Sequence, residues 1–163
     1  MIMRHGKAEA FAPEDHRRRL TDRGHREATA AGEWLSDQGI VPTYAFVSSA
    51  TRARQTWKAL VAGHATPAKA RVEDAVYSAD ANSALDVLRD APPDAEIVLY
   101  IGHNPTAASL AHLLDDGEPD PVAFRAMSAG VPTSAIAVLE ISVPWADLDS
   151  GTGHLMAFYA GRA

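Results

Sequence analysis

Three short polar groups in the sequence combine arginine and histidine in a way that suits the binding of an anion. Arg4 and His5 stand beside Gly6 near the start of the chain, Arg52 lies in the first half, and His103 lies in the second. Guanidinium groups form paired hydrogen bonds with phosphate oxygens, and fixed positive groups lower the barrier to phosphoryl transfer. If the fold brings these side chains together, they form a site for phosphoryl chemistry.

A histidine in such a site can also be the nucleophile. It must then present an unprotonated ring nitrogen, and a hydrogen bond from its other nitrogen to a backbone carbonyl would fix that tautomer. Gly6 beside His5 allows the backbone to approach closely enough for such a bond. We expect His103, as an imidazolium, to neutralise phosphate charge. The scheme requires no metal and no cofactor.

The candidate residues lie where predicted strands end. Three apolar runs are typical of strands: residues 2–3, 44–47 and 97–101. Arg4 and His5 follow the first run, and Arg52 falls in the first turn of the helix predicted after the second. His103 directly follows the third run, which is continuously apolar, as in strands buried on both faces. Ligands of open α/β sheets bind beyond the carboxyl ends of strands, so we expect these groups to converge if the strands are neighbours.

The remaining pattern alternates helices with extended segments. Four helices are predicted. The first runs from Thr21 as N-cap to about Gly39, the second from about 48–51 to 62, and the third over 82–89. The fourth has Asn104 as N-cap and Pro105 as first helical residue, and it ends at about 114. We expect loops over 7–20 and 115–132, a weak extended segment over 72–77, and final strands over 135–141 and 155–159. This order predicts one domain, residues 1–163, with an α/β fold: a three-layer α/β/α sandwich around a mostly parallel sheet.

Composition excludes several classes of function. Hydrophobic residues make up 47% of the 163 residues and charged residues 22%, which argues against disorder. The absence of cysteine excludes disulfides, thiolate metal sites and a cysteine nucleophile. A net charge of −6 disfavours nucleic-acid binding. No apolar run reaches the roughly 20 residues of a membrane span, and no signal peptide is recognisable, so we expect no membrane partner and a cytoplasmic location.

Taken in order, the motifs resemble those of the histidine phosphatase superfamily, which has the phosphoglycerate mutase-like fold. Arg4-His5-Gly6 looks like its signature triplet, and residues 48–56 (SSATRARQT) are similar to the segment that carries its second phosphate-binding arginine. Residues 102–105 (GHNP) are similar to the segment that carries its second histidine. The short chain, residues 18–24 (RRLTDRG) and residues 54–57 (RQTW) look most like the SixA-type phosphohistidine phosphatases.

This resemblance implies a role for each matched residue. His5 would be the nucleophile that becomes phosphorylated, Arg4 and Arg52 would hold the phosphate, and His103 would complete the pocket. Arg18 would help to bind the anion, with Arg19 as the competing choice. The implied protein is a metal-independent phosphohydrolase with a phosphohistidine enzyme intermediate, and its expected partner is a phosphorylated substrate, most suitably phosphohistidine in a protein.

The sequence departs from this family at the carboxylic acid that protonates the leaving group in many members. Ala75 stands at the aligned position, and Glu73, Asp74 and Asp80 nearby are more typical of surface carboxylates. A phosphoramidate needs less help from a general acid than an alkyl phosphate, because its leaving nitrogen can already carry a proton. The departure therefore favours phosphohistidine, or esters with good leaving groups, as substrate.

Several alternatives stay open at this point. The protein could be a small-molecule phosphomonoesterase or a non-catalytic phosphate-binding module. A mutase is disfavoured because the chain lacks insertions that would shelter a phosphorylated intermediate, and a metal site at His5 and His103 is disfavoured by the nearby arginines. Only three residues precede Arg4, so we expect a short first strand or a natural chain that begins earlier. The other histidines are expected to be exposed or structural: His16, His25, His64, His112 and His154.

Overall fold

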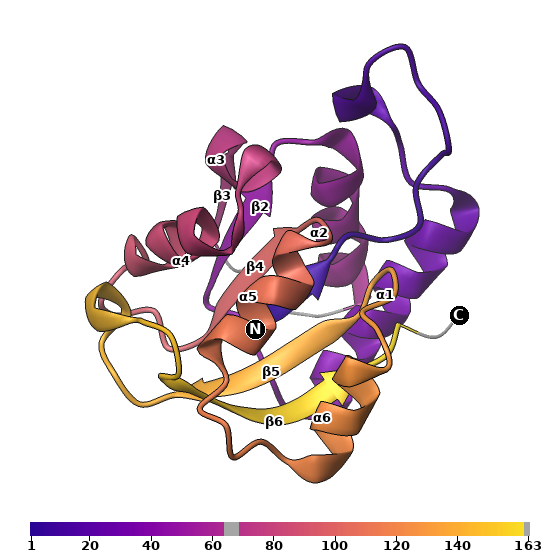
Figure 1. Cartoon of the computed structure of the whole chain (residues 1–163). Helices are drawn as coiled ribbons and strands as arrows, with labels where there is room; N and C mark the ends of the chain where they lie inside the picture. The colour runs from indigo at the N-terminus through magenta and orange to yellow at the C-terminus, as the bar shows by residue number, and fades with distance from the viewer. Residues whose placement is uncertain (64–68, 162–163) are drawn as a thin grey trace.

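A single mixed sheet organises the chain. The structure is a computed structural model that describes residues 1–63 and 69–161. In these residues the strands are β1 (Ile2–Arg4), β2 (Tyr44–Ser48), β3 (Lys69–Glu73), β4 (Val98–Gly102), β5 (Ile136–Ile141) and β6 (Gly153–Tyr159). They lie in the order β3-β2-β4-β1-β5-β6 (Figure 1). The first four are parallel, whereas β5 runs antiparallel to both β1 and β6. The mostly parallel sheet agrees with the prediction.

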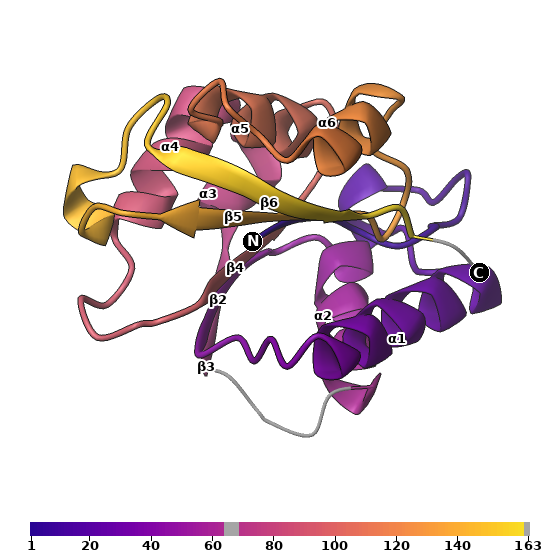
Figure 2. The same ribbon diagram turned by 90° about the horizontal axis from the view of Figure 1, so that it is seen from below.

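Helices cover both faces of this sheet. One face carries α1 (Asp22–Asp37) and α2 (Thr51–Gly63). The other carries α3 (Asp74–Ser78), α4 (Ala81–Arg89), α5 (Thr106–Leu114) and α6 (Pro121–Ser128). Figure 2 shows the two helical layers on opposite sides of the strands. The predicted three-layer α/β/α sandwich is therefore confirmed. Within the described residues, no helix combines the length and the apolar character needed to cross a membrane.

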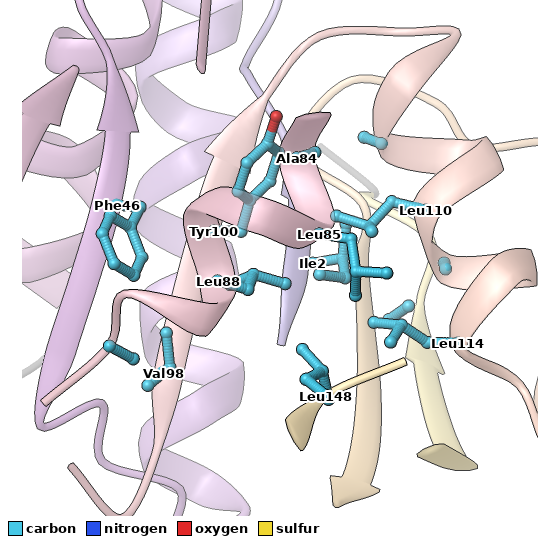
Figure 3. Close-up of a cluster of buried hydrophobic side chains, with 14 of the residues drawn as sticks. Ile2, Phe46, Ala84, Leu85, Leu88, Val98, Tyr100, Leu110, Leu114 and Leu148 are labelled. Atoms are coloured by element: carbon cyan, nitrogen blue, oxygen red, sulfur yellow. The ribbon is translucent and has the colours of Figure 1, made fainter. Parts of the chain in front are cut away.

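Alternate residues of the central strands supply two separate cores. Val98 and Tyr100 of β4 point into the cluster on the side of α4 and α5 (Figure 3), whereas Leu99 and Ile101 join the cluster against α1 and α2. All four are at most 1% exposed. Burial of each of the three aliphatic side chains among them is worth about 1.5–3 kcal/mol. Because both faces of β4 are covered, its sequence is apolar without alternation, as predicted.

Helix α1 follows its sequence signals closely. The Thr21 side chain accepts a hydrogen bond from the backbone N–H of Gly24 at 3.1 Å and so caps the helix. Past its end, Gly39 adopts a left-handed backbone with φ of 67°. Gly24 also has a tertiary function, since a Cβ at this position would lie 2.1 Å from the carbonyl oxygen of Lys7. The close approach fixes the segment that follows His5 against α1.

Two predictions of secondary structure are wrong. The extended segment expected over 72–77 ends at Glu73, where α3 begins with an acidic residue in its first turn. The loop expected over 115–132 contains α6. The carboxylate of Asp120 accepts hydrogen bonds from the N–H groups of Val122 and Ala123, and Pro121 occupies the first turn. Aspartate and proline, which are also common in loops, act here as a helix start.

The predicted cap of α5 is also wrong. The helix begins at Thr106, Pro105 stands at the N-cap position, and the Asn104–Pro105 peptide bond is cis. Instead of capping the helix, the Asn104 side chain donates a hydrogen bond to the carbonyl oxygen of Val131 at 3.0 Å. It thereby ties the start of α5 to the segment between α6 and β5.

The first strand is short, as expected, and has a partner on each side. β1 pairs with β4 and β5, and the ladder continues past the strand through the N–H of His5, which donates to the carbonyl oxygen of Gly102 at 3.0 Å. At the opposite, amino end of the parallel strands, a cavity of about 930 Å³ opens among mainly apolar side chains, including those of Val98, Trp145 and Met156.

Candidate active site

The carboxyl ends of three adjacent strands bring the predicted residues together. β4 lies between β1 and β2, so His5 after β1, Arg52 at the start of α2 and His103 after β4 meet at one edge of the sheet. The imidazole rings of His5 and His103 have centroids 5.0 Å apart. The Arg52 Nε donates a hydrogen bond to His5 Nε2 at 3.3 Å. Convergence of these residues was predicted from their positions at strand ends.

His5 has the tautomer that a nucleophile requires. Its Nδ1 lies 2.7 Å from the carbonyl oxygen of Gly6, so Nδ1 carries the proton and donates it. Nε2 is then unprotonated and accepts the hydrogen bond from Arg52. Burial lowers the pKa of His5 to about 4, opposed by the Gly6 hydrogen bond and assisted by the neighbouring guanidinium groups, first that of Arg52. The ring is therefore neutral at physiological pH.

This shift predicts the titration of the free protein. In a ¹⁵N NMR titration, the His5 ring should change protonation near pH 4, since its pKa is lowered to about 4, and Nε2 should stay unprotonated above that pH. The signal is assigned with a His5→Asn variant, and the exposed His25 serves as a reference in the same spectra. A His5 midpoint near the ordinary histidine value of about 6.5 would contradict the prediction.

Arg52 is held in place by its own helix and by the loop around His5. Its side chain is 7% exposed. Thr56, one turn later in α2, donates its hydroxyl proton to the carbonyl oxygen of Arg52 at 2.7 Å and accepts a hydrogen bond from the N–H of Gly6 at 2.9 Å. Thr56 thus connects α2 to the Arg4-His5-Gly6 segment. The place of Thr56 at the end of the SSATRARQT segment does not by itself indicate this role.

Arg4 is oriented by the opposite side of the pocket. Its Nη1 donates to the carbonyl oxygen of Val131 at 2.8 Å, while its buried Nε has no hydrogen-bond partner among the described residues. Burial lowers the pKa of Arg4, and the charge of Glu27 opposes this shift. Glu27 is fully buried in α1 and accepts hydrogen bonds from Arg23 and Thr133. This buried carboxylate was not predicted, although Glu27 lies one residue from the apolar stripe of α1.

His103 lies against His5 and is partly buried in the site. Its Nε2 lies 2.7 Å from the Ser48 hydroxyl, and its Nδ1 is buried without a partner among the described residues. Burial, followed by the proximity of His5 and Arg52, lowers the pKa of His103 to about 3. The ring is thus neutral in the free pocket, where the neighbouring positive groups oppose a further cation. The expected imidazolium concerns the phosphate-bound site, where the charge of the anion would favour it.

Asp15 and Tyr77, which were not predicted as site residues, form the rim of the pocket together with His16 and Arg18. The Asp15 carboxylate accepts hydrogen bonds from Arg52 and from the Tyr77 hydroxyl, both at 3.0 Å. The Tyr77 ring packs edge-on against His16 and His103, with centroids 5.0 and 5.6 Å away. Arg18 is the third donor to Asp15, and together these groups hold the pKa of Asp15 far below its usual range, Arg18 having the largest effect.

Two further predictions concern residues of this rim. Arg18 lies beside the pocket, where its Nη1 donates to Asp15 at 2.9 Å and its Nε donates to the carbonyl oxygen of Glu9 at 2.6 Å. Arg19 is exposed, so Arg18 is the better placed of the two candidates. His16 has a satisfied side chain, as expected: it is half-buried, and its Nε2 lies 2.9 Å from the Ser49 hydroxyl. His64 lies outside the described residues.

None of the three candidate proton donors contacts His5, Arg52 or His103 through a described hydrogen bond or ion pair. Glu73 is paired with Arg71. Asp80 caps α4 through the N–H of Ser83, and this hydrogen bond lowers its pKa. Asp74 is exposed at the start of α3. The side chain that this region contributes to the pocket is Tyr77.

The electrostatics of the pocket favour an anion. Arg18 and Arg52 contact the carboxylate of Asp15, Arg4 lies near the charge of Glu27, and both histidines are neutral. The three guanidinium groups thus outnumber the two carboxylates. Among the described residues, no group of three or more histidine and carboxylate side chains could hold a metal ion. The site is thus arranged to bind a compact oxyanion through guanidinium and imidazole groups.

Comparisons with known proteins agree with this chemistry. A family model of the histidine phosphatase superfamily, branch 1, matches residues 1–76. An uncharacterized protein of Mycobacterium tuberculosis is 36% identical over 163 residues, which cover 98% of this chain and 100% of the relative. The structure of the SixA protein from Nakamurella multipartitia has a TM-score of 0.82 and 32% identity, with 97% of this chain and 92% of that chain covered.

A second solved structure holds an anion. The protein histidine phosphatase SixA complexed with tungstate has a TM-score of 0.80 and 27% identity, and the match covers 98% of this chain and 95% of that chain. The matches to both structures cover nearly the whole chain, whereas the family model matches only residues 1–76. By its sequence, its fold and its SixA-like relatives, the chain belongs to the histidine phosphatase superfamily and is a phosphatase.

Proposed function

We propose that this phosphatase removes phosphate from phosphohistidine in proteins, with His5 as nucleophile and without a metal. The observation that carries the proposal is the orientation of His5, whose Nδ1 is tied to Gly6 while its lone pair on Nε2 faces Arg52. Likeness to a protein histidine phosphatase supports the substrate class. The clustered guanidinium groups, which would repel a divalent cation, support the absence of a metal from the reaction.

The reaction has two steps. In the first, His5 Nε2 attacks phosphorus in line, the new nitrogen–phosphorus bond forms, and the bond to the leaving group breaks on the opposite side. Arg4, Arg18 and Arg52 bind the equatorial oxygens, where negative charge is spread in the transition state. In the second step, water attacks phosphorus, and the electron pair of the nitrogen–phosphorus bond returns to Nε2. Phosphate then leaves.

The lack of a carboxylic acid at the rim supports phosphohistidine over alkyl phosphates. Glu73 and Asp80 are engaged elsewhere, and Asp15, whose pKa is lowered, carries no proton to donate near neutral pH. An alkyl oxygen is a poor leaving group unless it is protonated as it departs. An imidazole that carries a proton on its distal nitrogen leaves as a neutral molecule.

A comparison of substrates tests the proposal. We expect kcat/KM for a phosphohistidine-bearing phosphotransfer domain to exceed kcat/KM for a panel of alkyl phosphates by about a hundredfold or more, the size of a general-acid contribution. Substrate labelled with ³²P and quenched in alkali should leave label on His5. Preference for small alkyl esters would instead indicate a phosphomonoesterase. Phosphate binding with neither turnover nor label would indicate a non-catalytic module.

A further inference from the structure

Asp15 is an anion among the groups that would bind the substrate's phosphate, and the two steps above give it no function. Its Oδ1 accepts a hydrogen bond from Arg18 at 2.9 Å, and its Oδ2 accepts from Arg52 and Tyr77, both at 3.0 Å. These donors hold its pKa far below the usual range, so the carboxylate is charged at neutral pH. A negative charge so close to a phosphate site repels phosphate. A function for this charge must therefore concern the other half of the substrate, which is the leaving group.

The exposure of the two residues indicates which half that is. His5 is 9% exposed, whereas the side chain of Asp15 is 52% exposed, so Asp15 lies nearer to solvent. An in-line displacement places the leaving group on the side of phosphorus opposite the nucleophile. The leaving group therefore lies toward the open mouth, which is the side of Asp15.

We infer that Asp15 selects phosphohistidine over phosphate esters, because its carboxylate accepts a hydrogen bond from the distal N–H of the departing imidazole ring. This inference rests on the proposed function and names the residue that determines its specificity. A carboxylate offers about four acceptor positions. The contacts with Arg18, Arg52 and Tyr77 use three of them, which leaves one on Oδ1 for the substrate.

The charges balance in this arrangement. The substrate ring carries a phosphoryl group on one nitrogen and a proton on the other, so the ring is positive before the reaction. As His5 Nε2 bonds to phosphorus, the substrate's nitrogen–phosphorus bond breaks and its electron pair stays on the ring nitrogen. The ring leaves as neutral imidazole without a proton transfer. Asp15 stabilises the positive ring, whereas it repels the negative oxygen that develops when an ester is cleaved.

The test compares two substrates in the same variant. In Asp15→Asn, the ratio of kcat/KM for phosphohistidine to kcat/KM for an aryl phosphate should fall about tenfold, as expected for a lost charge-assisted hydrogen bond. If Asp15 only positions Arg52 and Arg18, both substrates are affected in proportion and the ratio is unchanged. A fall of less than about threefold, which is under 1 kcal/mol, would overturn the inference.

Matched variants separate charge from position. Glu14→Gln removes the same charge from a neighbouring residue, which pairs with the exposed Arg17 at 3.0 Å. In this control variant, the ratio of the two kcat/KM values should stay within about twofold of that of the unmodified protein. Asp15→Glu keeps the carboxylate, and its ratio should lie above that of Asp15→Asn. Equal ratios in the two Asp15 variants would count against the inference. If the unmodified protein neither hydrolyses phosphohistidine nor labels His5, the proposed function itself fails, a result distinct from a failure of Asp15 alone.

Discussion

His5→Ala should abolish turnover. The substitution removes His5 Nε2, the atom that forms the covalent intermediate in the proposed reaction. Loss of a nucleophile lowers kcat by roughly 10⁵–10⁶-fold in comparable covalent enzymes, and an effect of that order is expected here. The measurement is release of phosphate from a chromogenic aryl phosphate and from phosphohistidine, together with the ³²P label on the protein.

The design of this experiment separates chemistry from folding. His5→Ala leaves the guanidinium groups of Arg4 and Arg52 in place, so the variant should still bind tungstate, with a Kd within about tenfold of the unmodified protein. His25→Ala removes an exposed histidine of α1 and should keep full activity. Turnover by His5→Ala above about one hundredth of the normal rate would exclude His5 as the obligatory nucleophile.

Arg52→Lys should lower kcat/KM by about 10²–10³-fold, the usual loss when one donor to a developing oxyanion is removed. A lysine keeps the positive charge, but it is a point charge that cannot reproduce a planar guanidinium. The Arg52 guanidinium reaches His5 with Nε while Nη1 and Nη2 hold the carbonyl oxygen and the carboxylate of Asp15. A single ammonium cannot contact both residues in this geometry.

The matched control lies on the same helix. Arg54→Lys changes an exposed arginine of α2 and should leave kcat/KM within about twofold, as is usual for a surface charge. Tungstate binding, followed by calorimetry, should weaken in Arg52→Lys and not in Arg54→Lys. If Arg52→Lys loses less than about tenfold in kcat/KM, the guanidinium geometry is not needed and a simple positive charge suffices.

The central part of the site could be predicted because the local sequence shows where its residues lie relative to the ends of the strands. Arg4 ends β1, His5 and His103 directly follow strands, and Arg52 lies in the first turn of a helix that follows a strand. In a parallel sheet, the carboxyl ends of neighbouring strands lie at one edge, so their flanking residues converge. The continuous apolar run of β4 indicated a strand buried on both faces, and this strand lies between β1 and β2, which brings the three strand ends together.

The rim could not be predicted in the same way. Asp15 and His16 lie in a segment without strand or helix periodicity, and they reach the pocket because the segment folds back onto α2 and α3. Tyr77 was expected in an extended segment, and only the helical turn of α3 aims its ring at His103. The neutral state of His103 likewise depends on burial and on the surrounding charges. Such tertiary effects leave no local pattern in the sequence.

The cavity at the amino end of the parallel strands is a region where stability could be engineered away from the catalytic residues. Val98 and Trp145 line it at the end of β4 opposite to His103, so larger apolar side chains at neighbouring alanines such as Ala157 could fill it without touching the oxyanion pocket. Filling empty volume is a common route to greater heat resistance. Thermal tolerance and reaction rate could therefore be optimised at opposite ends of the same strands, with little trade-off between them.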